Sequence, residues 1–172
     1  LNLVHRDVKP GNVLISSSAE VKLTDFGVVK TSSAPKSTQA GVVKGKFAYM
    51  SPEQARGDDV DARTDVFALG IVLWEMLAGR RPFRGETPWE IATARLAGGP
   101  PNLRHLAPDV PVALEEIVRT AMQPDPERRY RTAGSMERAL AAWATPTHPT
   151  MRPNRRRSAR TDHSGIANRD AR

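Results

Sequence analysis

The chain has 172 residues, no cysteine and a formal net charge of +7. A chain of this length can bury the core of one ordinary domain, and without cysteine it can form neither disulfides nor thiolate metal sites. The longest apolar run, residues 66–74, is far shorter than the roughly 20 residues that span a bilayer, and no secretory signal is visible. We therefore expect a cytoplasmic protein without a membrane span.

Most of the net positive charge lies in the last part of the chain. Residues 145–172 contain seven arginines and two aspartates and have little to bury. We expect a folded domain over residues 1–143 and a basic, disordered tail over residues 144–172. The run Arg155-Arg156-Arg157 is compatible with nucleic acid or an anionic membrane surface and equally with a solvated tail, so we expect no specific nucleic-acid partner.

The first stretch in chain order is the eight-residue segment from His5 to Asn12, His-Arg-Asp-Val-Lys-Pro-Gly-Asn. It combines an imidazole, two cations, a carboxylate and an amide, which are all groups suited to phosphate chemistry. Its proline and glycine are incompatible with regular helix. We therefore predict a loop that carries chemistry.

A β-hairpin is predicted directly after this loop. Residues 13–15 and 21–24 are short β-prone runs, separated by a serine-rich connection. An antiparallel hairpin brings Asn12, at the start of the first strand, beside Asp25, at the end of the second. Two oxygen ligands thirteen positions apart thereby become neighbours.

The rest of the chain is predicted to be irregular at first and then helical. Residues 26–50 show no periodic pattern and indicate a functional or disordered segment. Ser51 is expected to cap a helix with Pro52 in its first turn. Longer helices are expected at residues 62–78, 87–97, 112–122 and 132–143. The first of these is apolar on nearly every side and ends at Gly79, so it should lie in the middle of the domain.

Two further groups of residues have structural rather than functional interpretations. Asp58, Asp59 and Asp61 precede the first long helix, where acidic residues cap the helix or complement its dipole, and we prefer this to a metal cluster. The three tryptophans, Trp74, Trp89 and Trp143, are interpreted as core or helix-packing residues.

Three motifs form an ordered set: the loop from His5 to Asn12, then Asp25-Phe26-Gly27, then Ser51-Pro52-Glu53. In this order and spacing they resemble the catalytic loop, the metal-binding triplet and the Ala-Pro-Glu motif of protein kinases. Asp65, Gly70 and Arg129 also fall where that family has structural residues. The resemblance extends from about Leu1 to Trp143 and is most similar in detail to bacterial, eukaryotic-like serine/threonine kinases.

The resemblance implies an α+β, mostly α fold: the C-terminal lobe of a protein kinase, with a small β-hairpin and a central buried helix. It also implies ATP-dependent transfer of a phosphoryl group to serine or threonine hydroxyls of a protein substrate, with ATP and Mg²⁺ as cofactors. Lys9, two positions after Asp7, is typical of the serine/threonine branch rather than the tyrosine branch.

The resemblance also implies a role for each residue of the site. Asp7 would orient the substrate hydroxyl and accept its proton, and Lys9 would contact the transferred phosphate. Asn12 and Asp25 would supply oxygen ligands to magnesium and so hold the nucleotide. The structural roles are a packing pair of His5 with Phe26, completion of the triplet by Gly27, an ion pair of Glu53 with Arg129, and acceptance by Asp65 of hydrogen bonds from the loop backbone.

Arg6, beside Asp7, implies regulation by phosphorylation. A phosphate on a residue of the irregular segment would pair with a buried guanidinium of Arg6 and order that segment. The candidate hydroxyls are those of Thr31, Ser32, Ser33, Ser37 and Thr38, and the sequence does not choose among them.

The chain departs from the family pattern in two respects. It contains no G-x-G-x-x-G loop and only four residues before His5, so we expect it to be the larger lobe alone. It would be a fragment of a longer kinase, the product of a truncated gene or the result of a mis-started reading frame. We expect this lobe to be inactive by itself. Lys46 stands where the family most often has threonine or serine, and it would either lie near Asp7 or turn outward. The alternative function is a non-catalytic interaction module that uses the helical surface between Thr87 and Met122.

Overall fold

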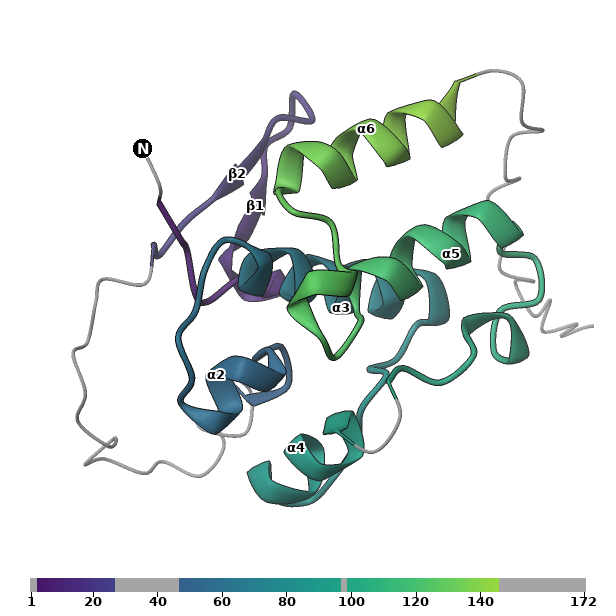
Figure 1. The fold of residues 1–172 in the computed structure, drawn as a ribbon. Helices are drawn as coiled ribbons and strands as arrows, with labels where there is room; N and C mark the ends of the chain where they lie inside the picture. The colour runs from purple at the N-terminus through teal and green to yellow at the C-terminus, as the bar shows by residue number, and fades with distance from the viewer. Residues whose placement is uncertain (1–2, 27–46, 97–98, 146–172) are drawn as a thin grey trace, which may run out of the picture.

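The computed structural model describes residues 3–26, 47–96 and 99–145, which form a mostly helical body with one small hairpin (Figure 1). The elements follow in the order η1 (Pro10–Asn12), β1 (Val13–Ile15), β2 (Val21–Leu23), α2 (Pro52–Arg56), α3 (Arg63–Ala78), α4 (Pro88–Leu96), η2 (Leu103–His105), α5 (Val112–Ala121), η3 (Pro126–Arg128) and α6 (Ala133–Ala144). The expected α+β, mostly α architecture is confirmed.

The predicted hairpin is present and lies at one edge of the helical body (Figure 1). Strands β1 and β2 are antiparallel, with Val13 opposite Leu23 and Leu14 opposite Lys22. The pairing continues one step beyond the strands, because the backbone N–H of Thr24 donates to the carbonyl of Asn12 at 2.9 Å. Thr24 therefore lies opposite Asn12, and Asp25 is the next residue along.

Helix α3 runs through the middle of the body, as predicted, and packs against α5 and α6 (Figure 1). Its N-cap is Ala62, and Gly79 ends it in the left-handed conformation at φ 69°. Its fully enclosed side chains include Val66, Phe67, Ile71 and Trp74. Met76 of the same helix is 74% exposed, so one of its apolar residues does not join the core.

Close contact between α3 and α5 depends on a glycine. A Cβ atom at Gly70 would lie 2.7 Å from Cγ of Met122 and 3.0 Å from Cβ of Ala121. Helix α5, at the place of the helix expected over residues 112–122, meets α3 with a stripe of apolar residues, all of them buried: Leu114, Ile117, Val118, Ala121 and Met122. Only a residue without a side chain lets the two helices approach this closely.

Helix α6 begins with a capping box. The hydroxyl of Thr132 accepts from the backbone N–H of Ser135, and the hydroxyl of Ser135 accepts from the backbone N–H of Thr132. The two reciprocal bonds satisfy donors that the first turn of a helix leaves unpaired. Met136 of α6 then joins the buried cluster formed with Val66 and Ile117.

The acidic residues before α3 behave as capping residues only in part. Asp61 accepts a hydrogen bond from the backbone N–H of Arg63 at 2.8 Å, which satisfies a donor of the first helical turn. Asp58 instead contacts Arg56 at 2.7 Å, and Asp59 is exposed. The capping interpretation therefore holds for Asp61.

Helix α4 exposes the tryptophan that we expected to be packed. Ile91 and Arg95, four residues apart, are buried on one face of the helix. Trp89 precedes Ile91 by two positions, which turns it to the opposite face, and it is 80% exposed. Trp74 is in the core as predicted, at 1% exposure. Trp143 is half-buried and packs against the same core cluster.

No helix in the described ranges is both long and apolar enough to cross a bilayer. The predicted tail lies outside these ranges from residue 146 onward. Its disorder and the domain boundary at residue 143 stay predictions.

Candidate active site

The loop from His5 to Asn12 is held from behind by Asp65 of α3. The backbone N–H groups of His5 and Arg6 donate to the two carboxylate oxygens of Asp65 at 2.7 and 2.8 Å. Arg6 has φ 64°, a left-handed conformation that is unusual outside glycine and that frequently occurs at functional sites. The predicted contact between Asp65 and the loop backbone is thus present, and it couples the loop to the buried helix.

Asp7 has one oxygen engaged and one available. Its Oδ2 accepts hydrogen bonds from Nζ of Lys9 at 2.6 Å and from Nδ2 of Asn12 at 3.2 Å. Among the described residues nothing donates to Oδ1. Charge-assisted bonds on one oxygen fix the carboxylate and leave the other to accept a proton from outside. Lys9 uses one of its three N–H donors in this contact, which leaves two for a phosphate.

The side-chain amide of Asn12 is oriented so that its nitrogen is hydrogen-bonded, while its oxygen has no hydrogen-bond partner among the described residues. Its Nδ2 donates to the backbone carbonyl of Asp7 at 2.8 Å as well as to the carboxylate. With both N–H groups used, Oδ1 is the atom left for a cation, and no described residue hydrogen-bonds to it. The side chain is 4% exposed, so this orientation is fixed by its surroundings.

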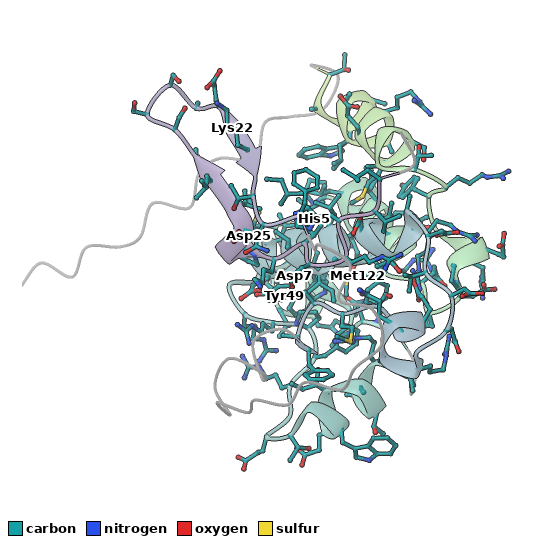
Figure 2. The ribbon with its side chains drawn as sticks, turned by 90° about the vertical axis from the view of Figure 1, so that its left-hand side faces the viewer. His5, Asp7, Lys22, Asp25, Tyr49 and Met122 are labelled. Carbon is teal, nitrogen blue, oxygen red and sulfur yellow. The ribbon has the colours of Figure 1, made fainter. Side chains whose placement is uncertain are left out.

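Asp25 lies at the base of the hairpin, directly after Thr24, which pairs with Asn12. It has φ 56°, which aspartate tolerates better than most residues. Figure 2 places Asp25, His5 and Asp7 together at the junction between the hairpin and the helical body. Magnesium is held by one or two protein carboxylate or amide oxygens together with phosphates and water. The donor set of Asn12 and Asp25 fits that requirement.

His5 is a packed residue, as expected. It is 3% exposed, and its ring lies 4.7 Å from the ring of Phe26. Its Nδ1 accepts from the backbone N–H of Asp7, so the proton of the neutral ring is on Nε2, which contacts the carbonyl of Thr24 at 3.0 Å. His5 therefore links the catalytic loop to the end of the hairpin.

The predicted ion pair between Glu53 and Arg129 is present and almost fully buried. Nη1 and Nη2 of Arg129 donate to the two oxygens of Glu53 at 2.7 and 2.8 Å. The other three N–H donors of the guanidinium reach backbone carbonyls of Gln123, Arg63 and Pro124. All five donors are used, so the guanidinium has the partners that a buried charge requires.

The environment of Glu53 stabilises its ionised form. Burial alone raises the pKa of this carboxyl, but hydrogen bonds from Arg129, from its own backbone N–H and from Thr64 outweigh it. The net result is a pKa lowered from 4.5 to about 2. Glu53 is thus a carboxylate at any physiological pH.

The segment that contains Glu53 also contacts the catalytic loop. Gln54 belongs to the capping box of α2 with Ser51, and its Nε2 donates to the carbonyl of Arg6 at 3.0 Å. The side chain of Arg6 itself is exposed. The expectation of a buried guanidinium is wrong, because the backbone of Arg6, and not its side chain, faces the body of the protein.

Two residues of this region were not singled out by the sequence analysis. Thr64 donates to Glu53 at 2.7 Å and contacts Ser51, so it joins α3 to the start of α2. Arg95 of α4 is 1% exposed and donates through Nη2 to the carbonyls of Phe47 and Ala48. The spacing from Ser51 to Gln54 signals the start of α2 but not the contacts of Thr64. Nothing in the sequence distinguishes Arg95 from an exposed helix arginine.

Several predicted residues lie outside the described ranges. They are Gly27, Lys46 and the candidate phosphorylation sites Thr31, Ser32, Ser33, Ser37 and Thr38. Their predicted roles stay predictions.

An oriented carboxylate, a lysine and two oxygen ligands, braced by a central helix, are the parts expected of the catalytic lobe of a protein kinase. The family model described as the protein kinase domain matches residues 1–141. The chain therefore belongs to the protein kinase family.

Curated relatives of bacterial origin agree with this assignment. The chain is 47% identical over 140 residues to the tyrosine-protein kinase MasK of Myxococcus xanthus. It is 40% identical over 160 residues to the serine/threonine-protein kinase PknA of Mycobacterium tuberculosis, and 44% identical over 135 residues to the serine/threonine-protein kinase PrkC of Bacillus subtilis.

The alignments cover most of this chain and a minor part of each relative. They include 81%, 91% and 78% of the chain but 22%, 36% and 21% of MasK, PknA and PrkC respectively. The chain thus spans between about a fifth and about a third of the length of these relatives.

Proposed function

We propose that residues 1–143 are the larger lobe of an ATP- and magnesium-dependent serine/threonine protein kinase. The observation that carries the proposal is the asymmetry of Asp7: Lys9 and Asn12 hold Oδ2, while nothing among the described residues engages Oδ1. A carboxylate held in this way can orient a substrate hydroxyl and take its proton as the new oxygen–phosphorus bond forms. The bond from the γ-phosphorus to the β-phosphate oxygen breaks in the same step.

The remaining polar groups of the site suit the nucleotide phosphates. The two N–H donors of Lys9 that Asp7 leaves free can contact the transferred phosphate. The oxygens of Asn12 and Asp25 would hold magnesium, which when bound neutralises charge on the phosphate oxygens. Asp65 positions the base through the loop backbone.

The acceptor is proposed to be serine or threonine. The position of Lys9, two residues after Asp7, supports this choice, as do the names of PknA and PrkC. MasK is named a tyrosine-protein kinase, which makes a tyrosine hydroxyl the competing acceptor. Phosphoamino-acid analysis of a transfer product tests it. A cytoplasmic location remains part of the proposal, on the grounds of the cysteine-free composition.

Regulation through Arg6 is also part of the proposal. The guanidinium of Arg6 is exposed, and no described residue forms an ion pair with it. It is therefore available to a phosphate on one of the candidate serines and threonines of the irregular segment.

One observation favours the non-catalytic interaction module as a second candidate. Helix α4 presents Trp89 at 80% exposure and Leu96 at 47%. Exposed aromatic and aliphatic side chains of this size are common in protein–protein interfaces. A module of this kind needs no nucleotide.

Titration of the purified chain with Mg-ATP separates the two functions. If the chain is a kinase lobe, it should bind Mg-ATP weakly, in the millimolar range, and Asp25→Asn should abolish this binding. The control variant Asp109→Asn should keep it, because it alters an exposed aspartate on another part of the molecule. Calorimetry or nuclear magnetic resonance would detect it. No binding at millimolar ligand, or equal binding by both variants, would favour the interaction module.

A further inference from the structure

A basic hollow lies on the surface between the end of α3 and α4. Its volume is about 370 Å³, and its lining includes the three arginines Arg80, Arg81 and Arg84 together with Ala48, Phe83 and Ile91. Known ligand sites have volumes of roughly 300–1,000 Å³. The hollow, called here the arginine pocket, is therefore large enough to receive side chains of a bound peptide.

The positive charge of the arginine pocket is only partly neutralised within the described part of the chain. Arg80 and Arg84 are exposed and form no ion pair there. Arg81 lies 3.7 Å from Glu75, and its guanidinium is 5.4 Å from the ring of Tyr49. The neighbouring acids Glu86 and Glu90 are not among the lining residues, and Glu90 accepts a hydrogen bond from the backbone N–H of Glu86.

A fourth cation lies behind the wall of the arginine pocket. The guanidinium of Arg95 is 5.4 Å from the ring of Phe83, which lines the pocket, and among the described residues its Nε has no hydrogen-bond partner. Burial lowers the pKa of Arg95 to about 10, although Glu53 acts in the opposite direction. An anion in the pocket would therefore add to the attraction of Glu53 for a buried charge whose described contacts are carbonyl oxygens and aromatic rings.

Consecutive residues line the arginine pocket and a small cavity beside the catalytic loop. Ala48 lines the pocket, and the next residue, Tyr49, lines a small cavity together with Asp7. Tyr49 is fixed there by a hydrogen bond of 2.5 Å from its hydroxyl to Glu75, and burial followed by this bond raises its pKa to about 12. A peptide whose hydroxyl meets Asp7 would thus pass Tyr49 and reach the arginines.

We propose that the arginine pocket is a substrate subsite that accepts an aspartate or glutamate side chain near the phosphorylated serine or threonine. The inference rests on the proposed kinase function, which it extends to a class of substrates: segments that are acidic on one side of the acceptor hydroxyl. Arg80 and Arg84 are its specificity-determining residues, and Arg95 positions the backbone of Phe47 and Ala48 along its edge.

Peptide binding to the whole 172-residue chain tests this subsite without requiring catalysis. The probes are fluorescent, otherwise neutral peptides with a central serine and one glutamate placed at successive positions on either side, and matched peptides with glutamine or lysine there. Fluorescence anisotropy measures their dissociation constants. The test variant is Arg80→Glu/Arg84→Glu. The control is Arg128→Glu/Arg131→Glu, which changes the net charge equally at two exposed arginines outside the pocket.

The expected result is a preference for glutamate peptides at positions on one side of the serine. The test variant should bind them about tenfold more weakly, because two attractive pairs become repulsive, and should bind the lysine peptides more tightly than the native chain does. The control should match the native chain, and added salt should reduce the preference. If charge reversal prevents folding, Arg80→Gln/Arg84→Gln should give a loss of about threefold in the same direction.

The subsite is contradicted if glutamate, glutamine and lysine peptides bind the native chain alike, if none binds at millimolar concentration, or if the test and control variants lose binding equally. Failure of the kinase function gives a different result, since it appears as no Mg-ATP binding at millimolar ligand or as binding that does not depend on Asp25. The Arg80→Glu/Arg84→Glu variant should bind Mg-ATP as the native chain does.

Discussion

At the scale of single residues, the ion pair of Glu53 with Arg129 makes the stability of the molecule depend on pH. The pKa of Glu53 is about 2 in the folded chain and 4.5 in its ordinary state. Because the folded value is the lower one, the stabilisation is complete above pH 4.5 and is lost as the pH falls toward 2. At about 1.4 kcal/mol per pH unit the loss amounts to roughly 3 kcal/mol.

Urea unfolding of the native chain at pH 7 and at pH 3 measures this effect, and the free energy of unfolding should fall between them. Glu53→Gln should be less stable at pH 7, because it leaves a buried guanidinium without a counter-charge. It should also lose much of the pH dependence over that range. A native-like acid sensitivity in Glu53→Gln would contradict the assignment.

The residue contacts that could be predicted are those of residues that belong to the set of motifs found in the expected order along the sequence. The bonds from the loop backbone to Asp65 and the pair of Glu53 with Arg129 were predicted because the motifs that contain these residues resemble those of protein kinases. The exposure of Arg6 and the burial of Arg95 were not. Whether a long cationic side chain is enclosed depends on what packs around it, and that is decided by residues far away in the sequence.

At the scale of helices, the contact of α3 with α5 depends on the absence of a side chain at Gly70. Gly70→Ala should destabilise the chain by about 1–2 kcal/mol, since the overlap with Met122 outweighs the gain of about 1 kcal/mol in helix propensity. Thermal unfolding followed by circular dichroism measures the change.

Gly134→Ala in α6 is a matched control for this substitution. A Cβ there meets nothing closer than 3.8 Å, so the same change should leave stability unaltered or raise it by up to about 1 kcal/mol. Equal effects of the two substitutions would show that backbone entropy, and not the contact with α5, explains the result.

Helices and the hairpin were largely predictable, because periodicity and capping residues are local signals. The apolar stripe of α5 and the cap of α2 at Ser51 are examples. The environment of Trp89 was not predictable in the same way. In a short helix that buries only one face, a large aromatic residue on the other face is exposed. The sequence of α4 does not indicate which of its faces packs against the rest of the protein.

At the scale of the whole molecule, we expect no measurable phosphoryl transfer by these 172 residues alone. The sequence has no G-x-G-x-x-G loop to cover the phosphates of ATP. Incubation of the purified chain with radiolabelled ATP, magnesium and a serine-containing protein should therefore give no labelled product. Transfer that disappears in Asp7→Asn would contradict this expectation and would show that the described lobe suffices for catalysis.

The contacts around the catalytic loop also differ greatly in the sequence separation of the residues that they join. The bond between Thr24 and Asn12 joins residues 12 apart, whereas the bonds from His5 to Asp65 and from Arg129 to Glu53 join residues 60 and 76 apart. The entropy lost on closing a loop grows with its length, and distant contacts form late in folding. We therefore expect a newly synthesised chain to form the hairpin contact between Thr24 and Asn12 first and to orient Asp7 only after the helices have packed.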